Sequence, residues 1–210
     1  FGLIGVFLST ALAQKNKPID KDATRETQKL YKSLRKLSKR HTLFAHQHAT
    51  EYGHGWAGDE DRSDVKSVTG SHPAMVGVDF SGFSGRSPEQ IAQAKERLRK
   101  NVVDTYNRGG VTTIAWHFSN PVSGGGFYWR DTVSLPAVSY IIPGGQAHEQ
   151  YKEILKGIAD WAHSIKGANG ELVPVIFRPY HELTVAGFGG VPRIAPGRSS
   201  SPCGNSQLAT

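Results

Sequence analysis

A short segment late in the chain gathers residue types that can carry out carboxyl chemistry. The apolar, β-branched run 173–177 is followed at once by Arg178, Tyr180, His181 and Glu182. A glutamate fixed at the end of a strand can serve as a general acid or base, because neighbouring groups and desolvation tune its pKa. The alternative is a strand end with solvated polar residues, and spacing alone leaves both interpretations open.

A second group of this kind follows another apolar run. Residues 111–118 predict a strand, and its last part begins the sequence Trp-His-Phe-Ser-Asn-Pro at 116–121. Trp116 and His117 are therefore further candidate site residues. For Trp116, packing in the core is as plausible as a place in a cleft. Asp79 likewise lies near the carboxyl end of a predicted strand at 74–80.

The elements that must position these residues alternate along the chain. Strands are expected at 41–49, 74–80, 111–118 and in the run that begins at residue 173, with helices at 23–40, from 88 to about 108, and at 147–166. Alternating strands and helices indicate a parallel sheet built from βαβ units. Function-bearing residues cluster after the strands, as in TIM barrels. We therefore expect a (β/α)8 TIM barrel, of which about the first four β/α units are present.

The helix that starts at Pro88 carries the clearest local signal. Ser87 is placed as an N-cap, Pro88 occupies the first helical position, and Gln90 completes a capping box. Gly109 ends the helix. The segments between the regular elements, 50–72 and the long aromatic loop after residue 118, are predicted to be loops, and long loops within compact domains are usually functional.

Charge is unevenly distributed along the 210 residues. Residues 1–40 contain ten Lys/Arg and three Asp/Glu, so they account for the whole net charge of +7. A nucleic-acid-binding protein needs a basic face on its folded body, which a neutral body does not provide. We therefore expect no nucleic-acid partner. With a single cysteine, Cys203, no disulfide framework or cysteine-based metal site is possible within the chain.

The first thirteen residues are apolar and end in Ala11-Leu12-Ala13. This pattern is typical of the hydrophobic region and cleavage site of a secretory signal peptide, here partial, with a buried helix as the alternative. The run is too short to span a membrane. We therefore expect a secreted or periplasmic protein and no membrane span.

The last segment, 184–210, lacks the periodicity of the rest, and we interpret it as a frameshifted, non-native tail. If the gene had encoded Leu-Asn-Gly-Ser-Trp-Phe-Trp-Trp-Gly, the loss of one A from the asparagine codon would give Leu-Thr-Val-Ala-Gly-Phe-Gly-Gly-Val. The latter is the sequence of residues 183–191. The barrel segment is accordingly expected at 14–183.

The two site motifs together resemble a known family. Residues 177–182, followed in the restored frame by Asn-Gly-Ser-Trp-Phe-Trp-Trp-Gly, resemble glycoside hydrolase family 26, whose main members are β-mannanases. Residues 116–121 are similar to the family's motif after its third strand, and Leu43 to Gln47 resembles its first-strand region. The resemblance covers roughly residues 27–183.

The resemblance implies a retaining mannan endo-1,4-β-mannosidase that acts on mannan, galactomannan or glucomannan, without cofactor or metal ion. Glu182 then corresponds to the general acid/base. The nucleophilic glutamate belongs to a seventh strand absent from this chain, so the chain as written is expected to be inactive. The substrate-binding positions are Trp116, His117, Arg178, Tyr180 and His181.

The chemistry of the residues fits this implication. A retaining glycosidase uses one protonated carboxyl and one ionised carboxyl about 5–5.5 Å apart. Aromatic rings such as Trp116, Tyr128 and Trp129 can cover the apolar faces of sugars.

Two other functions are compatible with parts of the sequence. His46 and His48 lie two residues apart on a predicted strand and so face the same side, which would suit a metal-dependent TIM-barrel hydrolase. Hydrogen-bonded structural histidines are the simpler explanation. The second alternative is a non-catalytic carbohydrate-binding product, because the chain offers one candidate glutamate and half a barrel.

Overall fold

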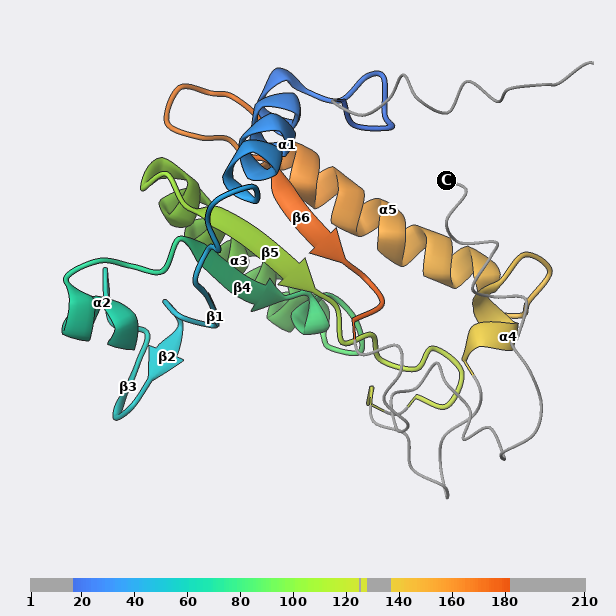
Figure 1. The fold of residues 1–210 in the computed structure, drawn as a ribbon. Helices are drawn as coiled ribbons and strands as arrows, with labels where there is room; N and C mark the ends of the chain where they lie inside the picture. The colour runs from blue at the N-terminus through green and yellow to red at the C-terminus, as the bar shows by residue number, and fades with distance from the viewer. Residues whose placement is uncertain (1–16, 125, 128–136, 182–210) are drawn as a thin grey trace, which may run out of the picture. The chain divides into compact units, whose positions relative to one another are not determined.

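The structure, a computed structural model, describes residues 17–124, 126–127 and 137–181. Its main sheet has four strands in the order β1 (Ala45–Gln47), β4 (Met75–Asp79), β5 (Val111–Ala115) and β6 (Val175–Arg178). Strands β1 and β4 pair in parallel, and the arrows of β4, β5 and β6 point the same way in Figure 1. The four strands expected from the sequence are all present, each shorter than predicted.

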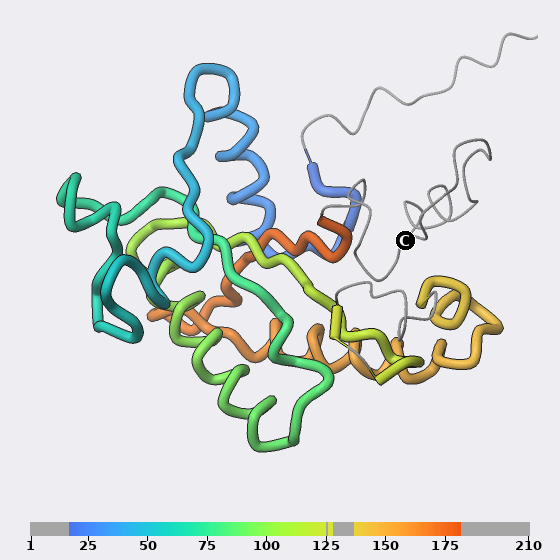
Figure 2. Tube along the Cα trace, turned by 90° about the horizontal axis from the view of Figure 1, so that it is seen from below, coloured from blue at the N-terminus to red at the C-terminus, as the bar shows by residue number. Residues whose placement is uncertain are grey.

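Helices connect consecutive strands of this sheet. Helix α3 (Pro88–Asn107) lies between β4 and β5 in the chain, α5 (His148–Ser164) lies between β5 and β6, and α1 (Arg25–Leu37) precedes β1. The trace in Figure 2 follows this alternation from blue to red. The parallel sheet with its connecting helices confirms the prediction of a partial (β/α) TIM barrel.

The start of α3 has the predicted capping box. The backbone N–H of Ser87 donates to Oε1 of Gln90 (3.1 Å), and the backbone N–H of Gln90 donates to Oγ of Ser87 (3.3 Å). These two bonds satisfy donors that the first helical turn leaves without intrahelical partners.

The segment 50–72, predicted to be a loop, contains short regular elements. Strands β2 (Tyr52–Gly53) and β3 (Trp56–Ala57) form an antiparallel hairpin, and α2 (Asp64–Thr69) follows. The Asp64 carboxylate holds the hairpin, because it accepts from Nε1 of Trp56 (2.6 Å) and from the backbone N–H of His54 (2.9 Å). Two-residue strands are too short to leave a periodic pattern in the sequence. A further helix, α4 (Val138–Ile141), and a 3-10 turn, η1 (Ser81–Phe83), were also not predicted.

The chain divides into two compact units. Of the described residues, the first contains 17–78, 96–114 and 161–177, and the second contains 79–95, 115–124, 126–127, 137–160 and 178–181. The first unit therefore holds most of the sheet, whereas the second holds the segments that follow β4, β5 and β6. In the first unit, the buried core is made of apolar side chains from strands and helices: Val76, Val78, Leu98, Val102, Ile114, Trp161, Ile165 and Val173.

The apolar face of α1, also in the first unit, is only part-buried. Its leucines 30, 34 and 37 line a groove of about 320 Å³ together with Leu43, Ala74 and Pro174. Leu37 itself is 37% exposed. The helix predicted at 23–40 is therefore confirmed, but its apolar face is not fully covered.

The second unit has a core of its own, which is rich in aromatic rings. Its buried apolar side chains are Phe80, Phe83, Ala94, Ala115, Trp116, Ala137, Ile141, Ala147, Tyr151 and Ile158. The candidate site residues that the structure describes, Trp116, His117, Arg178, Tyr180 and His181, all belong to this unit.

Candidate active site

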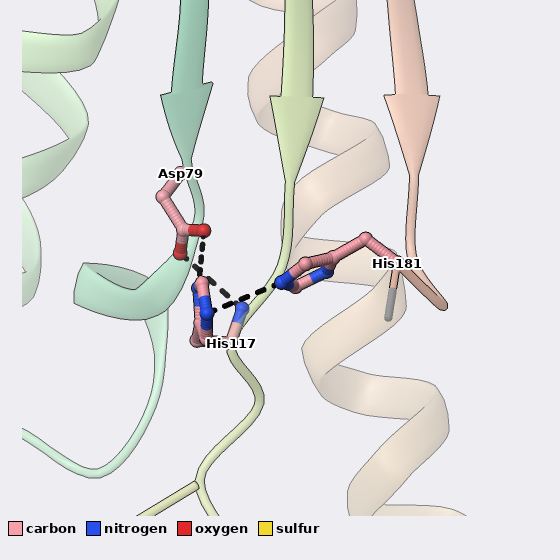
Figure 3. A group of neighbouring side chains, drawn as sticks. All are labelled: Asp79, His117 and His181. Carbon is pink, nitrogen blue, oxygen red and sulfur yellow. Dashed lines mark hydrogen bonds and ion pairs between the residues drawn. The ribbon is translucent and has the colours of Figure 1, made fainter. Parts of the chain in front are cut away.

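Three polar side chains meet in the second unit from the ends of three strands. Asp79 is the last residue of β4, His117 follows β5 by two residues, and His181 follows β6 by three. Figure 3 shows the three side chains directed toward one another below the strand arrows. Ligand-binding and catalytic groups of barrels occupy this carboxyl end of the strands.

Asp79 holds His117 in place. Its Oδ2 lies 2.6 Å from Nδ1 of the imidazole, and its Oδ1 accepts from the backbone N–H groups of His117 (3.3 Å) and Ser81 (2.6 Å). The Asp79 side chain is only 6% exposed. Because an ionised carboxylate can only accept, Nδ1 of His117 carries the proton of this bond.

The other nitrogen of His117 faces a second histidine. Nε2 of His117 and Nε2 of His181 are 3.1 Å apart, and the two rings meet edge-on at 4.4 Å between centroids and an angle of 73°. A hydrogen bond between two imidazole nitrogens needs one donor and one acceptor, so one proton lies between them. Asp79, His117 and His181 thus form a continuous hydrogen-bonded chain.

Trp116 directly precedes His117 in the sequence, but its side chain is buried. It is 3% exposed and stacks on Tyr151 with 5.9 Å between ring centroids and an angle of 11°. Phe118 packs against both rings, at 4.7 Å from Trp116 and 5.4 Å from Tyr151. The structure therefore favours core packing for Trp116, one of the two roles that its sequence position left open.

Tyr180 and Arg178 lie closer to solvent than Trp116 does. Tyr180 is 43% exposed, and its hydroxyl is 3.0 Å from that of Tyr151. Burial, followed by this hydrogen bond, raises the pKa of Tyr151 well above its usual range. The hydroxyl of Tyr151 therefore stays protonated and supports Tyr180 from the core side. Arg178, the last residue of β6, is exposed.

The loop after β5 contributes an aromatic ring to the histidines. The Phe127 ring lies 4.7 Å from the ring of His117, tilted by 55°. The remaining candidates of the sequence analysis, Glu182, Tyr128 and Trp129, lie outside the described residues.

The sequence analysis did not include Asp79 or Tyr151 among the site residues. Asp79 is expected only near the end of a strand, and Tyr151 falls within the helix expected at 147–166. No local pattern marks either residue, because each acts on a side chain distant in sequence. His117 is 38 residues from Asp79, and Tyr180 is 29 residues from Tyr151.

His46 and His48, the residues of the metal-hydrolase alternative, belong to the first unit, whereas Asp79, His117 and His181 belong to the second. His48 has a positive φ of 55° and is hydrogen-bonded to Glu51. Among the described residues, the group of side chains spaced to hold a metal ion is Asp79, His117 and His181, and it contains neither His46 nor His48.

The parallel strands and the polar chain at their carboxyl ends define a protein of the (β/α)-barrel class with a strand-end site. The family model for glycosyl hydrolase family 26 matches residues 19–189. The chain therefore belongs to glycosyl hydrolase family 26, as its motifs predicted.

Curated relatives agree with this assignment. Over 169 residues the chain is 32% identical to a mannan endo-1,4-beta-mannosidase of Bifidobacterium adolescentis, and the match covers 78% of this chain and 16% of the relative. Over 137 residues it is 23% identical to a mannan endo-1,4-beta-mannosidase of Bacillus subtilis, and this match covers 63% of this chain and 36% of the relative.

Solved structures support the fold. A family 26 β-mannanase of Bacteroides ovatus has a TM-score of 0.71 and 34% identity, over 80% of this chain and 48% of that one. A modular endo-β-1,4-mannanase of Cellulomonas fimi has a TM-score of 0.73 and 34% identity, over 83% and 39%. The chain thus spans less than half the length of each of these relatives.

Proposed function

We propose that the protein is a retaining glycoside hydrolase that cleaves β-1,4-mannosidic bonds in mannan, galactomannan or glucomannan. The observation that carries the proposal is the hydrogen-bonded chain from Asp79 to His181, which ends one residue before Glu182. Family membership and the names of the relatives support the proposed substrate class.

In this proposal Glu182 is the general acid/base. It donates a proton to the glycosidic oxygen as the bond to the anomeric carbon breaks, while a second carboxylate attacks that carbon and forms a glycosyl-enzyme. Glu182, now ionised, takes a proton from a water molecule that hydrolyses the intermediate. The protein regains its starting state, and the sugar keeps its anomeric configuration.

Asp79 does not suit the role of the attacking carboxylate. Its Oδ1 accepts two backbone N–H bonds, its Oδ2 is bound to Nδ1 of His117, and its side chain is 6% exposed. A nucleophile needs an oxygen that can reach the anomeric carbon. Among the described strand ends, Asp79 therefore acts by holding His117, and we assign the nucleophile to a glutamate outside these segments.

The other proposed positions divide into two kinds. His117, His181, Arg178 and Tyr180 offer polar groups at the strand ends, where hydrogen bonds to sugar hydroxyls would orient the substrate. Trp116 would contribute indirectly, because its packing fixes the positions of the Phe118 and Tyr151 rings.

The decisive experiment measures hydrolysis of β-1,4-mannan. It compares protein from the gene as written with protein from a gene that carries one extra A after codon 183, each with and without Glu182→Gln. Loss of the general acid should lower the rate by about 10²–10⁴-fold. Proton NMR of the first products should show the β-anomer. Sugar binding without hydrolysis in every version would instead support a carbohydrate-binding protein.

We also propose export of the protein through the segment 1–13, which lies outside the described residues. Within the described part of the chain, no helix has the length and apolar character needed to cross a membrane. N-terminal sequencing of protein recovered outside the cytoplasm should begin at Gln14, and an uncleaved N-terminus would contradict the proposal.

A further inference from the structure

The chain of Asp79, His117 and His181 has a second chemical property, which does not involve sugar. Each residue offers one atom that can bind a metal ion, and the three atoms all lie within 4.8 Å of one another. Two other described histidines pair with single carboxylates, His48 with Glu51 and His72 with Asp61. The strand-end group differs from them because two imidazoles converge on one point.

The spacing of the two histidines suits a tetrahedral ion. Their Nε2 atoms are 3.1 Å apart. Two zinc–nitrogen bonds of about 2.0–2.1 Å at a tetrahedral angle place the nitrogens roughly 3.3–3.4 Å apart. A shift of a few tenths of an ångström would therefore let an ion replace the proton that the two imidazoles share.

Asp79 contacts the ring nitrogen of His117 that would not bind the metal ion. In metal sites the ligating imidazole usually donates its other N–H to a carboxylate, which fixes the tautomer and makes the ligand more basic. The 2.6 Å contact between Oδ2 of Asp79 and Nδ1 of His117 has this arrangement. It directs the lone pair of His117 Nε2 toward His181. The backbone N–H groups of Ser81 and His117 in turn hold the carboxylate.

We propose that this group binds a divalent transition-metal ion of the Zn²⁺ type, with Nε2 of His117 and Nε2 of His181 as ligands, Asp79 as the supporting carboxylate and water completing the shell. His117 is 28% exposed, so solvent can reach the ion. Imidazole ligands favour zinc, copper and nickel over magnesium or calcium. No chemical step is assigned to the ion.

The proposed function adds a consequence to this binding. If His117 and His181 orient the sugar, an ion between them competes with substrate. We therefore expect Zn²⁺ to inhibit hydrolysis reversibly, with recovery after addition of EDTA.

Zn²⁺ binding itself is measured by isothermal titration calorimetry on the full chain at pH 7.5, so the result does not depend on activity. We expect one ion per chain. His117→Ala and His181→Ala should weaken binding at least tenfold, and Asp79→Asn about 10–100-fold, as expected for loss of a supporting carboxylate. The control, His163→Ala, removes an exposed histidine of α5 and should leave the affinity within about twofold of that of the unchanged protein. Circular dichroism of each variant identifies any that misfold.

X-ray absorption of the zinc-loaded, unsubstituted protein provides a test that needs no variant. It should show two imidazole nitrogens around the ion. Absence of binding, or binding that survives both histidine substitutions, overturns the proposal. Zinc binding without mannan hydrolysis by protein from the restored frame would leave this inference standing and count against the proposed function. Hydrolysis without zinc binding would do the reverse.

Discussion

The carboxylate of Asp79 and the imidazole of His117 are joined twice, through Oδ2 to Nδ1 at 2.6 Å and through Oδ1 to the backbone N–H at 3.3 Å. These bonds connect the end of β4 to the segment after β5. They fix the ring orientation and the tautomer of His117, and through it the hydrogen bond to His181. Asp79 is thus a positioning residue for the two histidines.

Asp79→Ala should therefore destabilise the fold as well as the site. It leaves the part-buried donors of His117 and Ser81 without their carboxylate acceptor, at an expected cost of about 2–4 kcal/mol in the free energy of unfolding. Denaturant-induced unfolding measures this difference. Asp160→Ala is the matched control, because it removes an exposed carboxylate paired with Lys156 and should cost less than about 1 kcal/mol. Equal effects of the two substitutions would contradict the assigned role of Asp79.

Substitutions of Trp116 distinguish a role in core packing from contact with the substrate. Because its ring is 3% exposed and stacked on Tyr151, Trp116→Ala should lower the free energy of unfolding by about 3–5 kcal/mol. Trp116→Phe should lower it less, and it should leave the KM for mannan within about twofold in protein that hydrolyses mannan. Trp161→Phe, at another buried tryptophan, serves as the comparison. A large rise in KM without loss of stability would place Trp116 in contact with sugar instead.

The sequence predicted elements well where the signal is local. The capping residues Ser87 and Gln90 and the β-branched runs mark α3 and the strands, because neighbours in sequence supply these patterns. Contacts between residues on neighbouring strands cannot be predicted from such local patterns. That Asp79 turns toward His117 depends on β4 and β5 being neighbours, and this order is set by the packing of the whole sheet. Likewise, the predicted helix at 147–166 contains Tyr151 but gives no sign that its hydroxyl contacts that of Tyr180.

The raised pKa of Tyr151 predicts loss of stability at alkaline pH. Burial and the hydrogen bond with Tyr180 favour the protonated phenol in the folded state. A folded-state pKa above the unfolded value of about 10 gives a contribution that is fully present below that pH and is lost as the pH rises toward the folded-state pKa. Thermal unfolding between roughly pH 9 and 12 should show a steeper decline for the unchanged protein than for Tyr151→Phe.

Tyr52→Phe provides the control for this titration, because Tyr52 is 54% exposed. It should leave the alkaline decline unchanged. If Tyr151→Phe and Tyr52→Phe give the same pH dependence, burial of Tyr151 does not control the stability of the fold at high pH.

The frameshift hypothesis for residues 184–210 makes the last prediction. Resequencing across codons 182–192 should reveal one additional A, and the corrected gene should encode Asn-Gly-Ser-Trp-Phe-Trp-Trp-Gly after Leu183. These residues continue the resemblance to family 26 directly beyond Glu182. We therefore expect protein from the restored frame to hydrolyse mannan, and protein from the gene as written to be inactive. A sequence without the additional base, together with an active chain as written, would show that the tail is genuine.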